Sequence, residues 1–169
     1  MGTTKTRTLN IRTTSGVVVD GIATVPCQAE AANVFAHGVD ADMADPFMTA
    51  VAEGLAQRQI GTLRYQFPYM QAGKSRVDAP AVAHEPVRAA VAKANTMWSS
   101  LPLFAGGKSV GGPMTSQAQA ISPLPGVLGL AFLGSPLHRV GKPAVDRVEH
   151  LSSVSASTLF IPGMRDALA

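Results

Sequence analysis

The stretch Leu101-Pro-Leu-Phe-Ala-Gly-Gly-Lys-Ser-Val-Gly111 passes from an apolar run into small residues, and the chain after it is suited to a helix. Its last five residues fit the pattern G-x-S-x-G, which is typical of a sharp strand-to-helix turn that exposes a nucleophilic serine. Glycine is needed on both sides, because a side chain on either flanking position would collide with the turn itself. The pattern predicts Ser109 as the nucleophile and places the N–H of Val110 next to a developing negative charge.

A phosphate-binding loop is the rival interpretation of the same residues. Gly107, Lys108 and Ser109 match the last three positions of G-x-x-x-x-G-K-[ST]. That loop also needs a glycine five positions before Gly107, where this chain has Pro102. Proline fixes φ and has no N–H for a phosphate, so the spacing excludes this interpretation. From the pentapeptide alone, a glycine-rich turn without chemistry stays open.

Composition and charge limit the classes of protein to be considered. The chain has 169 residues, 46% of them hydrophobic, which suits one globular α/β domain with a real core. The net charge of +3 is scattered, without a basic run interleaved with aromatics, so nucleic acid is not an expected partner. The longest apolar stretch, Val127 to Leu133, is too short to span a bilayer. The polar N-terminus and the lone Cys27, expected to be at least half-buried, favour a cytoplasmic protein.

Strand and helix patterns alternate along the chain. A helix is expected from Pro46 onward, with Asp45 as its cap and its apolar face at Phe47, Val51 and Leu55. Strands are predicted at 8–13, 17–25, 32–36, 61–67, 102–106, 127–133 and 157–161, further helices at 85–98 and for about ten residues after Ser109, and an exposed loop at 70–84. This alternation predicts a mainly parallel sheet with helices on both faces.

Three predicted strands end in polar or glycine-rich residues, at His37-Gly38, at Gly107–Gly111 and at Gly163–Asp166. The carboxyl ends of parallel strands are where function collects in such sheets. A serine nucleophile needs a base, usually histidine, that is oriented by a carboxylate. Asp166 follows a late strand, where the orienting acid falls in the chain order serine, acid, histidine.

Six segments together point to one known family: Phe35–Gly38, Asp45–Met48, Leu63–Met70, Leu103–Gly112, Phe132–His138 with Gly141–Pro143, and Thr158–Asp166. Through them the chain resembles an α/β-hydrolase of the dienelactone-hydrolase-like group, in particular the bacterial relatives of the KANL3/Tex30 domain. The resemblance covers most of residues 30–169 and implies a serine hydrolase that acts on a carboxylic ester or similar acyl bond of a small molecule, without a cofactor. It implies Ser109 as nucleophile, Asp166 as triad acid, and backbone N–H groups near Gly38 and Val39 and at Val110 as the oxyanion hole.

The chain departs from the family pattern in three places. Asp40 and Asp42 follow the oxyanion loop, where carboxylates would oppose negative charge unless they point to water. Pro113 replaces a helix former but is tolerated in a first turn. The chain ends three residues after Asp166, whereas the family places its catalytic histidine after one further strand. We therefore expect a fold that lacks its last strand and helix, in a chain that is either truncated or a natural variant without the base and that can be inactive as given.

Four histidines are present, and each needs a role. His37 is expected to hold the oxyanion loop by hydrogen bonds, His84 to be solvated in the 70–84 loop, and His150 to be exposed. His138 follows a strand at the functional edge and is the best-placed substitute base. No two histidines have the tight spacing of a zinc site, so no metal is expected.

The remaining aromatic and charged side chains give no clear indication of a binding site. Tyr65, Phe67 and Tyr69 alternate, which suits a strand and its exit rather than an aromatic binding site. Lys108 is either a steering charge for anionic substrates or an exposed lysine without a role.

The alternative function is a non-catalytic module that binds a ligand or partner. A missing outer strand exposes a sheet edge, and a homo-oligomer can form on that edge.

Overall fold

The computed structural model describes residues 3–39, 41–137 and 148–163. Its strands are β1 (Lys5–Arg12), β2 (Val18–Val25), β3 (Ala31–Ala36), β4 (Ile60–Tyr65), β5 (Leu103–Lys108), β6 (Val127–Leu133) and β7 (Ser157–Ile161). Its helices are α1 (Pro46–Ala56), α2 (Pro68–Gln71), α3 (Pro80–Met97), α4 (Gly111–Ile121) and the 3-10 helix η1 (Glu149–Ser153).

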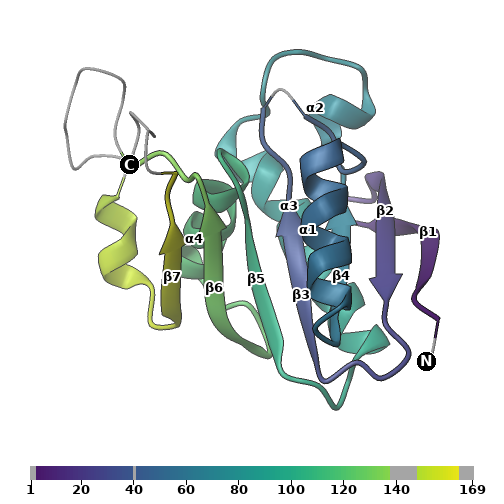
Figure 1. Cartoon of the computed structure of the whole chain (residues 1–169). Coiled ribbons are helices and arrows are strands. Elements are labelled where there is room, and N and C mark those ends of the chain that lie inside the picture. Colours follow the sequence, from purple (N-terminus) through teal and green to yellow (C-terminus); the bar gives the residue numbers. More distant parts are fainter. Residues whose placement is uncertain (1–2, 40, 138–147, 164–169) are drawn as a thin grey trace.

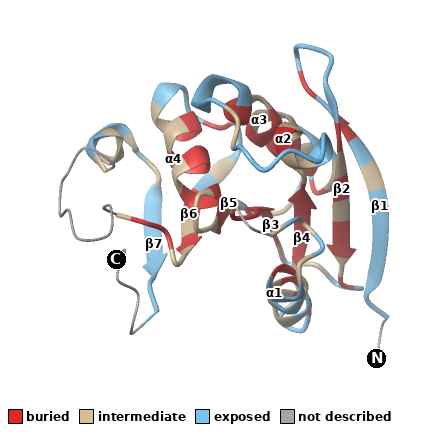
Figure 2. Cartoon of the chain, turned by 90° about the horizontal axis from the view of Figure 1, so that it is seen from above, coloured by how far each residue is buried: buried red, intermediate tan, exposed pale blue. Residues whose placement is uncertain are grey.

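The strands form one sheet in the order β1-β2-β4-β3-β5-β6-β7 (Figure 1). β1, β2 and β4 pair antiparallel, whereas β4, β3, β5, β6 and β7 run parallel. Helix α1 covers one face of the sheet, and α2, α3 and α4 cover the other (Figure 2). The mainly parallel sheet with helices on both faces is therefore confirmed.

The central strand β3 is buried because it lies between β4 and β5 and beneath helices. Val34, Phe35 and Ala36 are each at most 1% exposed. A strand that is covered on both faces reads as a continuous apolar run, which is the pattern of this segment. Its carboxyl end therefore emerges from a rigid part of the sheet, directly before His37 and Gly38.

Helix α1 begins as its sequence indicates, but it buries another face. The Asp45 carboxylate accepts a hydrogen bond from the Phe47 N–H at 2.9 Å, which confirms the cap. The buried residues are Met48, Ala52 and Ala56. The prediction of the buried face is therefore wrong: each buried residue follows an expected one by one position, and Phe47 is 42% exposed. The small alanines face the sheet because they let the helix approach it closely.

The segment expected to be an exposed loop at residues 70–84 is partly helical. Helix α2 extends to Gln71, and α3 begins at Pro80 rather than Glu85. The expected start at Glu85 rested on the helical spacing of Val87, Ala90, Val91 and Ala94, which begins only after the first turns of α3. In the structure Pro86 lies inside α3, where its missing N–H removes one hydrogen bond of the helix.

Strand β7 lies at one edge of the sheet, opposite β1 (Figure 1). Every residue of β7 is exposed, including Leu159 at 57% and Ile161 at 49%. Among the described residues, no helix is long and apolar enough to cross a membrane.

Candidate active site

Ser109 lies in the turn that joins β5 to α4, and its backbone is strained. Its φ is +50°, in the left-handed region, which costs a non-glycine residue about 1–3 kcal/mol. Two hydrogen bonds hold it there: the Ser109 N–H donates to the Leu133 carbonyl at 3.0 Å, and the Ser109 carbonyl accepts from the Gly112 N–H at 3.1 Å. The expected strained turn at the serine is confirmed.

The two flanking glycines are required by close backbone contacts. A Cβ at Gly107 would lie 2.6 Å from the Gly111 carbonyl carbon, a collision within the turn as expected. A Cβ at Gly111 would lie 2.6 Å from the carbonyl oxygens of both Ala36 and His37. A side chain at Gly111 is therefore excluded by the backbone at the end of β3 and not by the turn itself.

The end of β3 brings Gly38 against Ser109. Strands β3 and β5 pair in parallel with Ala36 opposite Gly107, so the residues after them emerge side by side. Gly38 is buried, and a Cβ there would lie 3.3 Å from the Ser109 Cβ and 3.9 Å from its Oγ. Val39 follows directly, and Val110 caps the start of α4. The structure thus brings together four of the residues singled out for the nucleophile and oxyanion hole.

His37 is fully buried, and both of its ring nitrogens are occupied. The Phe67 N–H donates to Nε2 at 3.1 Å, so the ring proton is on Nδ1, which donates to the Gly38 carbonyl at 2.7 Å. Burial lowers the pKa of His37, although the hydrogen bond to Gly38 opposes that shift. These contacts support the expected role of holding the loop and leave no nitrogen free to take the Ser109 proton.

The unfolding free energy should fall when the pH is lowered from about 7.5 to about 5.5. Burial lowers the pKa of His37, His84 and His150 below 6.5, so the unfolded chain binds protons first on acidification. Each histidine contributes at most about 1.4 kcal/mol per pH unit between its unfolded and folded pKa. Urea unfolding at several pH values measures the slope, and His150→Gln should reduce it. A free energy that stays constant or rises on acidification would contradict the burial of these rings.

The acidic loop after Gly38 is arranged so that Asp42 points to water. Asp42 is exposed and accepts a hydrogen bond from the Ala44 N–H at 2.8 Å, while Asp40 lies outside the described residues. Arg64 is 3% exposed and donates to the Met43 carbonyl at 2.9 Å and to the Thr49 hydroxyl at 2.8 Å. Arg64 therefore anchors this loop to α1 and is not available for an acidic substrate.

A cleft of about 440 Å³ opens beside Ser109. Its lining residues are Phe47, Lys108, Ser109, Leu133, Gly134, Ile161, Pro162 and Gly163. The Lys108 ammonium lies 4.7 Å from the centre of the Phe47 ring, a cation–π contact between two residues that line the cleft. The cleft therefore has mainly apolar walls and one positive charge next to the serine.

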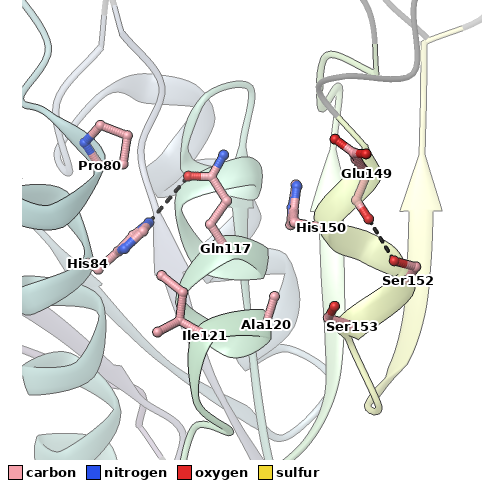
Figure 3. A pocket seen from close by; sticks show the side chains of 9 residues that line it. All are labelled: Pro80, His84, Gln117, Ala120, Ile121, Glu149, His150, Ser152 and Ser153. Atoms are coloured by element: carbon pink, nitrogen blue, oxygen red, sulfur yellow. Dashed lines mark hydrogen bonds between the residues drawn. The ribbon is translucent and has the colours of Figure 1, made fainter.

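His84 and His150 lie at a different cavity, of about 660 Å³, to which both side chains contribute (Figure 3). His84 was expected in a solvated loop, but it lies within α3, is 8% exposed and pairs with the Gln117 side chain at 3.3 Å. His150 was expected to be exposed, but it is half-buried, with Nε2 2.7 Å from the Ser116 hydroxyl. Both expectations are wrong because η1 and α3 pack against α4.

Two of the expected site residues, Asp166 and His138, lie outside the described residues. In the part of the chain that is described, no group of three or more His, Cys, Asp or Glu side chains is placed to hold a metal ion. Cys27 is exposed rather than buried, because it follows β2 in a surface turn.

Tyr69 lies at the candidate site, although its sequence pattern predicted no role there. Its hydroxyl lies 3.2 Å from the Gly38 carbonyl, beside the serine turn. The alternation of Tyr65, Phe67 and Tyr69 suggested a strand exit and carried no signal for this contact. The contact joins α2 to the loop after β3, and the two residues lie 31 positions apart in the chain.

Comparison with known proteins agrees with this geometry. Residues 29–169 match the family model described as an alpha/beta hydrolase domain, so the chain belongs to the α/β-hydrolase family. A search of curated proteins found no match.

Solved structures show the same fold at low sequence identity. The dienelactone hydrolase of Anabaena variabilis superposes with a TM-score of 0.73 at 18% identity, over 98% of this chain and 89% of that one. The esterase Pf2001 of Pyrococcus furiosus gives 0.76 at 14% identity, over 98% and 74% of the two chains. An alpha-beta serine hydrolase homologue from Coxiella burnetii gives 0.68 at 16% identity, over 93% and 86%.

Proposed function

We propose that this chain is a serine hydrolase that cleaves a carboxylic ester or related acyl bond. The observation that carries the proposal is the position of Ser109, which is held at φ +50° at the end of β5 with Gly38 packed against its Cβ. A strained serine beside a second strand end is the arrangement that presents a hydroxyl group to a substrate carbonyl. Membership of the α/β-hydrolase family supports the same reaction class.

The proposed reaction uses the described positions of Ser109, Val39 and Val110 together with a histidine and Asp166. The Ser109 Oγ attacks the carbonyl carbon and its proton passes to a histidine, while the carbonyl oxygen becomes negative. The backbone N–H groups of Val39 and Val110 donate hydrogen bonds to that oxygen. The C–O bond to the alcohol breaks as the histidine returns the proton to it. Water then attacks the acyl-serine, which releases the acid and restores Ser109, and Asp166 orients the histidine throughout.

The identity of the base can be narrowed within this chain. His37 is committed to Gly38 and Phe67, and His84 and His150 contact α4 side chains at the other cavity. Of the four histidines, His138 is therefore the candidate base in the same chain. The mainly apolar walls of the cleft favour a small-molecule ester with an apolar acyl group, and Lys108 adds one positive charge to the lining.

A fluorophosphonate probe tests the proposal directly, because it reacts only with an activated serine. We expect rapid labelling of the folded chain, with the added mass on the peptide that carries Ser109. His138→Asn should slow labelling by on the order of 10³-fold if His138 is the base. A folded chain that stays unlabelled, or one that is labelled at another residue, would contradict the proposal.

The second candidate is a non-catalytic module that binds a partner through β7. The exposure of every residue of this edge strand favours it, because an unpaired edge can accept a strand from another chain. The unlabelled outcome above, together with a dimeric mass in solution, is the result that would favour this function. Labelled and monomeric protein would contradict it.

A further inference from the structure

The Tyr69 hydroxyl contacts the Gly38–Val39 segment, which supplies the Val39 N–H in the proposed hydrolase reaction. It lies in α2, is 3% exposed, and its hydroxyl is 3.2 Å from the Gly38 carbonyl and 3.3 Å from the Val39 carbonyl. Both carbonyls belong to the loop that follows β3. A buried side chain therefore reaches directly into the loop beside Ser109.

The Gly38 carbonyl accepts a hydrogen bond from His37 Nδ1 at 2.7 Å, and it shares the single proton of the Tyr69 hydroxyl, at 3.2 Å, with the Val39 carbonyl at 3.3 Å. A carbonyl oxygen has two lone pairs, so these donors fix the orientation of the peptide that joins Gly38 to Val39. The peptide is trans, and in a planar trans peptide the N–H points opposite to the C=O. The Val39 N–H is therefore directed away from His37 and Tyr69.

Tyr69 is itself held on several sides. Its N–H donates to the Asp78 carboxylate at 2.8 Å, and its carbonyl accepts from the Lys74 N–H at 2.8 Å. Its ring stacks on Phe67 with centres 6.3 Å apart, and Phe67 lies edge-on to His37 at 5.0 Å. The hydroxyl consequently has little freedom to leave the two carbonyls that it contacts.

We infer that Tyr69 is a positioning residue, which orients the Gly38–Val39 peptide so that the Val39 N–H faces the oxygen that becomes negative. This inference rests on the proposed hydrolase function. An oxyanion donor contributes most when it is already oriented before the reaction, because no reorganisation is then needed. His37 supplies one hydrogen bond to the Gly38 carbonyl, and the shared hydroxyl proton of Tyr69 supplies the contact that comes from outside the loop.

Tyr69→Phe tests the inference, with Tyr65→Phe as the matched control. Both changes remove one hydroxyl from a buried ring, but the Tyr65 hydroxyl has no hydrogen-bond partner among the described residues. Its polar neighbour Thr115 directs its own hydroxyl at the Gly111 carbonyl, at 2.8 Å. We expect Tyr69→Phe to lower the labelling rate and kcat by about tenfold to a hundredfold with KM nearly unchanged, and Tyr65→Phe to stay within about twofold of the wild type.

The amide resonance of Val39 is a second readout that does not depend on activity. In protein labelled with 15N-valine, this resonance should shift in Tyr69→Phe and not in Tyr65→Phe. If Ser109 does not react in the wild type, the hydrolase proposal fails, and the Val39 resonance alone then decides whether Tyr69 orients the peptide. Equal labelling rates for the two variants, or an unmoved Val39 resonance, would overturn the inference.

Thermal unfolding of each variant shows whether it is folded before the assay. If Tyr69→Phe does not fold, 3-fluorotyrosine can be introduced into the Tyr65→Phe variant. The sequence has two tyrosines, so Tyr69 is then the only one that carries the label. Its 19F resonance should move when the probe modifies Ser109. A resonance that stays in place would contradict a contact between Tyr69 and the oxyanion peptide.

Discussion

Ser109→Ala should abolish fluorophosphonate labelling and lower ester hydrolysis by on the order of 10³- to 10⁶-fold. In the proposed reaction the hydroxyl forms the acyl-enzyme, and without it the remaining backbone donors would stabilise only the attack of water. Alanine keeps a Cβ at φ +50°, so the strain of the turn is retained and the stability should change by less than about 1 kcal/mol. Probe labelling, ester hydrolysis and thermal unfolding measure the three effects on the same preparation.

Ser99→Ala is the control for that variant. Ser99 is exposed in the turn after α3 and does not line the Ser109 cleft, so its loss should leave both labelling and hydrolysis unchanged. Retention of more than about a tenth of the activity by Ser109→Ala would show that hydrolysis arises at another site, since a nucleophile cannot be lost at so small a cost.

Gly106→Ala should produce the largest loss of stability, of about 3 kcal/mol or more. Gly106 lies opposite Ala131 in the β5–β6 ladder, and a Cβ there would be 1.7 Å from the Ala131 carbonyl oxygen and 2.7 Å from its carbon. Both are backbone atoms, so the two strands must separate directly beside the serine turn. Such a loss is a large part of the 5–15 kcal/mol that stabilises a typical domain, and urea unfolding measures it.

Gly54→Ala is the matched control, because it adds the same methyl group where nothing lies within 4 Å. Gly54 is inside α1, where alanine is favoured over glycine by about 1 kcal/mol, so this variant should be as stable as the wild type or more so. Thermal unfolding of Gly106→Ala within about 2 °C of the wild type would contradict the close approach of β5 and β6.

Local features of the fold were predictable from the sequence. The cap at Asp45, the strain at Ser109 and the requirement for Gly107 follow from contacts between residues close in the chain. Alternating strand and helix patterns were sufficient to predict a mainly parallel sheet, because crossover connections leave few other arrangements. The start of α3 was misplaced, because the apolar spacing that predicted the helix begins at Val87, whereas α3 begins at Pro80.

Environments created by packing were not predictable in the same way. His84 is buried and His150 is half-buried because α3 and η1 pack against α4, and the sequence around either histidine carries no pattern that predicts this contact. The buried face of α1 was misjudged because larger apolar residues were expected to face the sheet. The structure instead places alanines against it, and Val51 and Leu55 line a separate apolar groove with β7.

The sequence by itself determined the strand-turn-helix unit around Ser109 and the family to which the chain belongs, because glycine sterics and element periodicity act over a few residues. Only the tertiary structure decided that Gly38 lies against Ser109 and that the Tyr69 hydroxyl reaches the Gly38 carbonyl. These contacts join segments far apart in the chain. Their geometry depends on strand order and on the path of α2, and neither is encoded in the residues that touch.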